Sequence, residues 1–295
     1  EIGTGDWSSD VCSSDLMRGR STLTAITLAI LFLVPSVARG AEGVSLRLND
    51  PGRPLQFKAA VEFGFISVLD HHLKFGTDGT YIDYVKEGGQ DNLYFFARVS
   101  AEMQIVGHHS LVFLYQPLNL ETTATLGRDV QVADVVYPED TAVDFRYGFD
   151  FYRFSYLYDF FKDPDQELSI GLSLQIRNAS ISFTSVDGDL RIVRNNIGPV
   201  PAFKIRGRYT FKPGVWIGGE VDGFWIKGKW ISGSSKNFEG AILDASVRAG
   251  YVIAPFVETF VNLRYLGGGA LGGKNLDFTR NWLHTLTFSI GIGIR

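Results

Sequence analysis

Apolar and polar residues alternate along ten segments of this chain, and the apolar face of most of these segments carries no charge. Residues 285–295 show the pattern best. Even-numbered positions from Leu286 to Ile294 are all large and apolar, whereas odd-numbered positions hold Thr, Ser, Gly and Arg. Successive side chains leave a β-strand on opposite faces, so a period of two predicts strands. The sequence therefore predicts an all-β chain.

Two of the ten predicted strands contain irregular positions. Pro117 cannot donate a hydrogen bond to a neighbouring strand, so the third strand is expected to contain a bulge or an edge. In the fourth strand the polar positions change parity between Asp150 and Arg153, which predicts a bulge there. Nine of the predicted strands cover residues 55–69, 92–106, 110–126, 143–161, 168–183, 215–230, 241–254, 256–266 and 285–295. The sixth strand along the chain precedes 215–230 and ends with residues 203–211.

The connections between the predicted strands alternate in length. Short turns follow the even-numbered strands, as at Gly107-His108-His109. Most of the other connections are longer (roughly residues 70–91, 127–142, 231–240 and 267–280), with Asp187-Gly188-Asp189 as a tight exception. Outer-membrane barrels have short periplasmic turns and long outer loops, and an even strand count returns the C-terminus to the periplasmic side.

Strand length and aromatic placement favour a membrane barrel over a soluble sheet. Many regular stretches reach about 9–11 residues, which crosses a membrane, whereas strands of soluble proteins average about five or six. The predicted fold is a closed, antiparallel, up-and-down transmembrane β-barrel of about ten strands, within a range of about eight to twelve. Its aromatic girdles are expected to include Trp216, Trp230, Tyr251, Tyr265 and Trp282, which lie near strand ends.

The N-terminal part of the chain does not share the strand pattern. Residues 1–16 are rich in Ser and Asp and resemble translated sequencing-adapter sequence, so we expect them to be non-native. Residues 17–40 are expected to be a secretory signal peptide, with basic residues before the apolar run Leu23–Val34 and small residues at the end. Residues 41–295 are then expected to form a single barrel domain.

Charge and cysteine content argue against several classes of function. The chain has 28 basic and 32 acidic residues, a formal net charge of −4, so no basic excess points to nucleic acid. Its one cysteine, Cys12, lies in the N-terminal segment, which leaves the expected barrel without disulfides or thiolate ligands. We expect neither a cofactor nor a metal site.

The polar faces of several predicted strands carry charges of both signs. Buried charges persist when they are paired, and a charge on the lipid face would cost about 2–4 kcal/mol near the membrane midplane. We therefore expect these side chains to point into the lumen and to pair between neighbouring strands, the sixth with the seventh and the eighth with the ninth. A transport path along them is the alternative. The predicted structural network comprises Lys204, Arg206, Arg208, Glu220, Asp222, Asp244, Arg248, Glu258 and Arg264.

One short motif has the residue types of a nucleophilic hydrolase. His108 and Ser110 resemble the His/Ser pair of outer-membrane lipid A deacylases, and Glu121 is an acid of suitable type. The predicted topology places His108 in a periplasmic turn, and 11 residues of strand would carry Glu121 roughly 35 Å away. This separation favours an ordinary polar turn.

Two further acidic motifs lie on the predicted outer rim. Asp70-His71-His72 and Asp187-Gly188-Asp189 are similar to the Asp/His and Asp pairs with which omptin-type proteases, themselves ten-stranded outer-membrane barrels, activate water. Their order along the chain is reversed relative to that family, and the second motif is also an ordinary hairpin turn. The adjacent histidines could bind a metal, but no other ligand has a helpful spacing. We therefore assign no catalytic residue.

The whole pattern resembles outer-membrane β-barrel proteins of diderm bacteria. The resemblance implies an integral outer-membrane location, contact with membrane lipid and lipopolysaccharide, and insertion by the barrel-assembly machinery. Such chains usually end on an aromatic residue, so we hypothesise that a Phe or Tyr is missing after Arg295.

A barrel of about ten strands with a charged lumen should be closed or nearly so, because eight strands already fill with side chains and only 16–18 leave a water channel. We expect a non-catalytic surface protein whose outer loops contact ligands or partners. A membrane-embedded hydrolase and a narrow channel, or conduit for lipids and apolar solutes, are the alternatives.

Overall fold

The computed structural model describes residues 54–295 apart from 162, 164 and 229–237. These residues belong to one compact unit, Arg47–Arg295. The predictions for the N-terminal segments and for Trp230 concern positions outside the described residues. Among the residues that the structure describes, no helix has the length and apolar character needed to cross a membrane.

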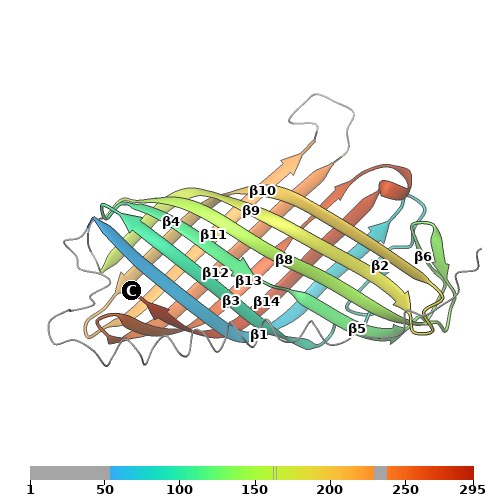
Figure 1. The fold of residues 1–295 in the computed structure, drawn as a ribbon, viewed down its shortest axis with the longest axis horizontal. Coiled ribbons are helices and arrows are strands. Elements are labelled where there is room, and N and C mark those ends of the chain that lie inside the picture. Colours follow the sequence, from blue (N-terminus) through green and yellow to red (C-terminus); the bar gives the residue numbers. More distant parts are fainter. Residues whose placement is uncertain (1–53, 162, 164, 229–237) are drawn as a thin grey trace, which may run out of the picture. The chain divides into compact units, whose positions relative to one another are not determined.

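Ten antiparallel strands form a closed β-barrel (Figure 1). Each strand pairs with its neighbours along the chain, and the last strand pairs with the first from Ala59–Ile294 to Phe75–Thr279, which closes the sheet. The predicted all-β, antiparallel, up-and-down barrel is confirmed. The barrel strands are β1 (Leu55–Phe75), β3 (Leu93–Ile105), β4 (His109–Gln116) continued by β5 (Asn119–Thr125), β8 (Ala142–Asp159), β9 (Gln166–Ser185), β10 (Arg191–Thr210), β11 (Val215–Lys227), β12 (Glu239–Ala254), β13 (Val257–Gly272) and β14 (Thr279–Ile294).

The two ends of the barrel differ in their connections. At one end, which we name the turn end, short segments join the strands, as between β3 and β4. At the other end, which we name the loop end, most connections are longer, and they contain all the remaining elements. These are β2 (Ile82–Asp83), which adds to β1, the hairpin of β6 (Val130–Val132) and β7 (Val135–Tyr137), and the 3₁₀ helix η1 (Asn275–Asp277).

The third barrel strand is interrupted at Pro117, as predicted. β4 ends at Gln116 and pairs with both β3 and β8, whereas β5 begins at Asn119 and pairs with β8 alone. The irregularity expected at this proline is thus a break in the strand, where the missing N–H removes a ladder donor.

The bulge predicted in the fourth strand is wrong, because β8 keeps one continuous register with β9. Outward-facing residues change from polar at Asp150 to aromatic at Tyr152. Inward-facing residues change at the same level from Phe151 to Arg153. At this level the environment of each face of the strand changes, but the alternation of inward and outward side chains continues without interruption.

Two further expectations are corrected. β1 and β13 continue to Phe75 and Gly272, beyond the predicted ends at Leu69 and Leu266, because the chain stays extended and paired with β14 where its residues become polar or small. Trp216 faces the interior and is 3% exposed, so it does not belong to an outer aromatic girdle.

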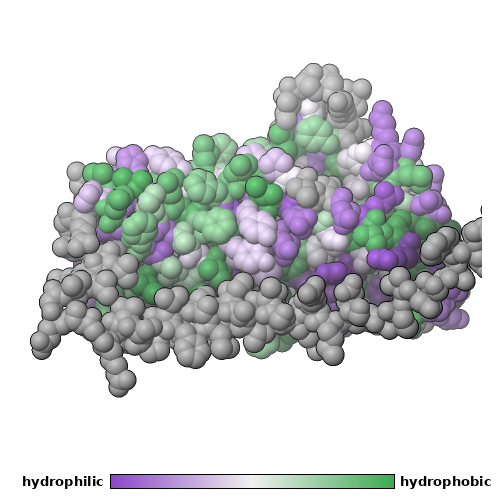
Figure 2. Space-filling view, viewed as in Figure 1, coloured by the Kyte–Doolittle hydropathy of each residue, from purple (hydrophilic) through white to green (hydrophobic). Residues whose placement is uncertain are grey.

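The barrel interior has two layers of opposite character. Toward the turn end the inward side chains are charged, and Arg153, Lys204 and Arg264 are at most 2% exposed. Toward the loop end they are apolar. The outer surface shows the reverse arrangement, with hydrophobic residues gathered toward the turn end and hydrophilic ones toward the loop end (Figure 2). At the loop end the barrel is therefore built like a soluble protein, with a hydrophobic core and a polar exterior.

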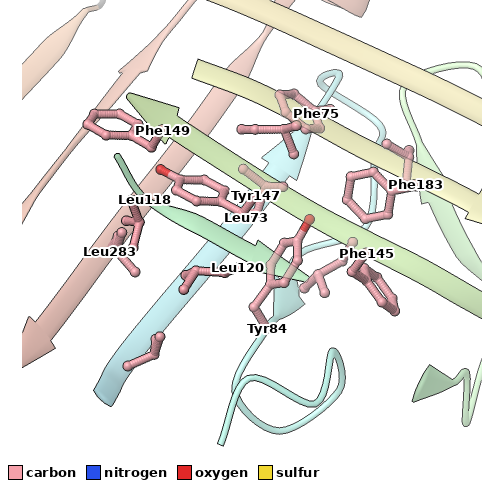
Figure 3. Packing of buried hydrophobic residues seen from close by; sticks show 14 of the residues in the cluster. Leu73, Phe75, Tyr84, Leu118, Leu120, Phe145, Tyr147, Phe149, Phe183 and Leu283 are labelled. Atoms are coloured by element: carbon pink, nitrogen blue, oxygen red, sulfur yellow. The ribbon is translucent and has the colours of Figure 1, made fainter. Parts of the chain in front are cut away.

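Segments from the loop-end connections complete the apolar layer. Tyr84, which follows β2, is fully buried and packs its ring against Phe145 and Phe183, with ring centroids 5.4 and 5.8 Å apart. Leu73 of β1 and Leu120 of β5 point toward the same cluster (Figure 3). The connection after β1 thus closes the interior from the loop end.

The barrel sheet contains two lines without strand pairing among the described residues. The first lies between β3 and β5, because β3 pairs with β4 only from Val99 onward. The connection after β1 covers this line, and Thr122 Oγ1 of β5 donates to Gly88 O at 2.5 Å.

The second line, which we name the β10–β11 seam, begins above the pair Phe203–Gly223. β10 continues to pair with β9 as far as Arg191, but its pairing with β11 ends at Phe203. A continued register would place Trp225 opposite Pro201. Proline has no N–H to donate and is tolerated at the edge of a sheet, which accounts for the unpaired seam.

Candidate functional site

The charged layer of the lumen is centred on Arg153 and two aspartates. Arg153 Nη1 lies 2.9 Å from Asp222 Oδ2 and 2.7 Å from Asp244 Oδ2. Lys204 Nζ donates to the same Asp222 oxygen at 2.7 Å, and Arg264 Nε donates to Asp244 Oδ1 at 2.5 Å. Each carboxylate therefore holds two cations, as buried charges require.

Glu220 forms a second centre closer to the turn end. It accepts from Lys204 Nζ at 2.9 Å, from Arg98 Nη2 at 2.7 Å and from Arg248 Nη2 at 2.8 Å. Arg98 and Arg248 also approach Glu62 Oε1, at 3.6 and 3.4 Å. These contacts connect strands from opposite sides of the lumen.

Three predicted partners differ from those in the structure. Arg206 binds Glu102 at 2.7 Å and Glu167 at 2.5 Å rather than an acid of β11. Arg208 binds Glu258 at 2.6 Å, and Arg248 does not. The reason is that Glu220 is already surrounded by cations, so the outer arginines of β10 turn toward other acids. The pairs of Lys204 with β11 and of Asp244 with Arg264 are as expected.

Five members of the layer were absent from the sequence-based network. They extend the ion pairs across the lumen, because the barrel is narrow enough for long side chains of non-adjacent strands to meet. A signal existed for four of them, which lie at polar positions of predicted strands, whereas Glu167 lies just before the predicted fifth strand. They are Glu62, Arg98, Glu102, Arg153 and Glu167.

A cavity of about 120 Å³ remains within the charged layer, lined among others by Arg98, Glu102 and Arg206. A water molecule needs about 10–15 Å³ by this measure, so the cavity has room for several waters.

The apolar layer of the described residues contains a buried histidine, His71, on β1 beyond the last outward apolar residue, Leu69. His71 Nδ1 donates to Gln90 Oε1 at 2.7 Å, Nε2 lies 3.3 Å from Asn281 Oδ1, and the ring stacks on Tyr84 at 4.6 Å. Burial lowers the pKa of His71 to about 4, and the hydrogen bonds to Gln90 and Asn281 and the charge of Asp70 offset this only in part. The imidazole is therefore neutral at physiological pH. Its hydrogen bond to Gln90 links the barrel wall to the connection after β1.

The deacylase-like residues are not brought together. His108 Nδ1 lies 2.8 Å from the Asp159 carbonyl oxygen, and its ring stacks on Tyr158. Ser110 points into the lumen and donates to Glu102 at 2.9 Å. Glu121 lies on the outer face of β5, 3.3 Å from Arg146 Nε. A histidine base must contact the serine hydroxyl that it activates, so this arrangement cannot act as a catalytic triad.

The omptin-like motifs each form local contacts only. Asp70 Oδ1 lies 2.8 Å from His72 Nε2 on the outer face of β1. Asp187 accepts from Ser185 Oγ at 2.5 Å and from the backbone N–H of Asp189 at 3.1 Å, and these bonds lower the pKa of Asp187. Within the described part of the chain no hydrogen bond or ion pair joins the two motifs, and no group of three or more His, Cys, Asp or Glu residues could hold a metal ion.

Comparison with known proteins finds similar folds and no family. No protein-family model matches the chain, and no curated protein matches it. Similar solved structures include the outer membrane protease OmpT from Escherichia coli (10% identity, 86% of this chain and 99% of that chain, TM-score 0.49). Neisserial surface protein A (13% identity, 82% and 99%, TM-score 0.32) and the Pseudomonas putida toluene transporter TodX (7% identity, 81% and 90%, TM-score 0.31) are also similar.

These three proteins are a protease, a surface protein and a transporter by name. Their identities of 13% or less and TM-scores below 0.5 transfer no activity to this chain. The function of this barrel is therefore inferred from its strand pairing and from the placement of its apolar residues.

Proposed function

We propose that this protein is an integral outer-membrane β-barrel that is non-catalytic and non-conducting, and that presents its loop end to ligands or partners at the cell surface. The single observation that carries the proposal is the reversal of polarity along the barrel. Near the turn end the wall is apolar outside and charged inside, and near the loop end it is polar outside and apolar inside.

The outward apolar band supports the membrane location. Phe203, Phe288 and Ile290 are 66%, 54% and 59% exposed, and similar residues occur on every barrel strand. Burying one such side chain is worth about 1.5–3 kcal/mol, so a band of them in water would be a strong driving force for aggregation. Lipid removes that cost. Residues with charged side chains reappear on the outer face beyond the band, as at Asp70 and Asp150.

The interior supports a closed barrel in place of a channel. Ion pairs bridge the lumen in the charged layer, and the aromatic cluster with Tyr84 and Phe145 fills the apolar layer. A permeating ion would have to break buried pairs and then cross a hydrophobic core, and both steps are costly. The lumen charges therefore serve as a structural network.

The loop end supplies the surface for ligands or partners. Its connections hold charged side chains in defined positions, for example Arg128, which donates to Glu87 at 2.7 Å and to the Tyr81 carbonyl at 2.9 Å. Contacts of this kind order the loops in the absence of a ligand, and an ordered surface loses less entropy on binding.

Membrane fractionation and bilayer recordings test the proposal together. We expect the protein to remain in the outer-membrane fraction, to migrate faster on gels before boiling than after, and to give no conductance in planar bilayers. A general porin in the same bilayers serves as the positive control. Recovery from the soluble periplasm would overturn the membrane location, and discrete conductance steps from the purified protein would overturn the closed lumen.

A further inference from the structure

Arg177 differs from the cations of the charged layer. It lies on the inner face of β9, in the apolar layer. Among the described residues no ion pair holds its guanidinium. The ring of Phe149 lies 4.8 Å from the guanidinium carbon, and the Tyr147 phenol lies close enough to act on its charge. Cations of the charged layer, such as Arg153 and Arg206, each meet at least one carboxylate. A guanidinium in apolar surroundings is stabilised strongly by an anion, so Arg177 is suited to hold one.

The space beside Arg177 is small and apolar. A hollow of about 30 Å³ is lined by Arg177, Tyr147, Phe149, Leu118 and Leu283, among other residues. By the measure of about 10–15 Å³ per water molecule, it has room for two oxygen atoms and their carbon, as in a carboxylate.

The β10–β11 seam lies next to this hollow. Arg177 is directly opposite Gly198 on β10, and directly opposite residues of neighbouring strands share one face of the sheet. A side chain at Gly198 would meet no atom of the described residues within 4 Å, so the space there is open among them. From Gly198 to Ala202 the other edge of β10 has no paired strand among the described residues.

An apolar groove lies where the seam begins, on the outer wall of the barrel. It measures about 620 Å³, starts at Phe203 and Gly223, and is bordered by Trp225, Tyr265 and Trp282. This volume falls within the range of about 300–1,000 Å³ that is typical of ligand sites. The groove and the hollow share the wall residues Ala241, Ile242, Gly267 and Gly268, so they lie on opposite sides of the same part of the sheet.

We propose that the seam and its two hollows form a binding site for a single-chain amphiphile with a carboxylate head, a long-chain fatty acid. The carboxylate pairs with Arg177 inside the wall, and the acyl chain passes the seam beside Gly198 and lies in the outer groove. The charge, the size of the inner hollow and the apolar lining of the groove select this ligand class. The inference rests on the proposed function, since the groove reaches lipid only if the barrel is in a membrane.

The test uses the full-length protein, purified and reconstituted in phosphatidylcholine vesicles, with 12-doxylstearic acid as the probe. Trp225 and Trp282 border the groove, so the nitroxide should quench their fluorescence on binding. The methyl ester of the same probe has the same chain without the charge. A charge-assisted hydrogen bond is worth about 1.5–3 kcal/mol, so we expect the acid to bind at least about tenfold more tightly than the ester.

Four variants test the specificity of the proposed site. Arg177→Gln should bind acid and ester alike, Arg177→Lys should keep part of the preference, and Arg146→Gln, on the outer face of β8, should behave as the wild type. Gly198→Leu should fill the open space beside Arg177 and weaken binding of the acid by about tenfold or more. Faster migration before boiling checks that each variant is folded, and Gly198→Leu keeps the test decisive if Arg177→Gln does not fold.

Equal binding of acid and ester by the wild type, or an unchanged preference in Arg177→Gln or in Gly198→Leu, would overturn the site. Absence of saturable quenching would do the same. These results leave the proposed function intact when the protein still inserts into membranes. A protein that does not insert would refute the proposed function itself, so the two failures are distinguishable.

Discussion

Replacement of Arg153 by methionine removes the central cation of the charged layer while keeping a long, unbranched side chain. Arg153 contacts Asp222 at 2.9 Å and Asp244 at 2.7 Å, and its Nη2 donates to Gln175 at 2.7 Å. All three interactions are buried, so no solvent replaces them in the variant.

The expected loss of stability depends on the ion pairs that remain in the variant. Removing one partner of a buried ion pair typically costs 3–5 kcal/mol, because the other charge stays desolvated. Asp222 keeps Lys204 at 2.7 Å, and Asp244 keeps Arg264 at 2.5 Å, so neither carboxylate loses all its cations. We therefore expect the free energy of unfolding to fall by about 3 kcal/mol, at the lower end of this range.

Reversible urea unfolding in phospholipid vesicles, followed by tryptophan fluorescence, measures this loss. Arg146→Met is the matched control, because its pair with Glu121 at 3.3 Å joins side chains that are 55% and 62% exposed. An exposed pair contributes about 0–1 kcal/mol. If Arg153→Met costs no more than Arg146→Met, the charged layer does not stabilise the barrel and the reasoning fails.

Three other predictions concern single positions. Gly171→Ala should lower the free energy of unfolding by about 1–3 kcal/mol, because a Cβ at Gly171 would lie 1.8 Å from a backbone oxygen. Gly207→Ala should lower it less, because a Cβ there would lie 3.7 Å from its nearest atom. Equal losses on urea unfolding would contradict this packing. Between pH 6.5 and about 4 the unfolded chain takes up a proton at His71 that the folded chain does not, so stability should fall by on the order of 3 kcal/mol as the pH falls through this window. His71→Gln should flatten that part of the pH profile, and an unchanged profile would refute the neutral imidazole. Phe288→Lys should cost about 2–4 kcal/mol in vesicles, and a neutral effect would place β14 away from lipid.

Period-two alternation located the strands because each barrel strand separates two different surroundings along most of its length. The alternation failed at Asp150 and Arg153 for the same reason. A strand that leaves the membrane exchanges its apolar and polar faces without changing register, and from the sequence alone this exchange looks like a bulge. Asp70 and His72 in β1 were assigned to a loop for a different reason, because the register of β1 shifts between Val68 and Asp70 and interrupts the period of two there.

The ion pairs were only partly predictable. Neighbouring strands bring Lys204 close to Asp222, which sequence order can anticipate. The pair of Arg206 with Glu102 spans 104 positions, and only the curvature of the closed barrel sets it. The seam had a visible signal in Pro199 and Pro201, since prolines inside a strand indicate an unpaired edge. No pattern in the sequence indicated the apolar surroundings of Arg177.

A nitroxide scan along β8 in vesicles tests the central claim most directly, because this strand crosses the level at which polarity reverses. Outward positions beyond the band should be reached by a water-soluble paramagnetic reagent, and those within it by oxygen dissolved in lipid. The account predicts aqueous exposure at Asp144 and Arg146, and lipid exposure at Phe154 and Tyr156. Aqueous exposure along the whole outer face, or lipid exposure at Asp144 and Arg146, would contradict a barrel embedded in the membrane by its turn-end half.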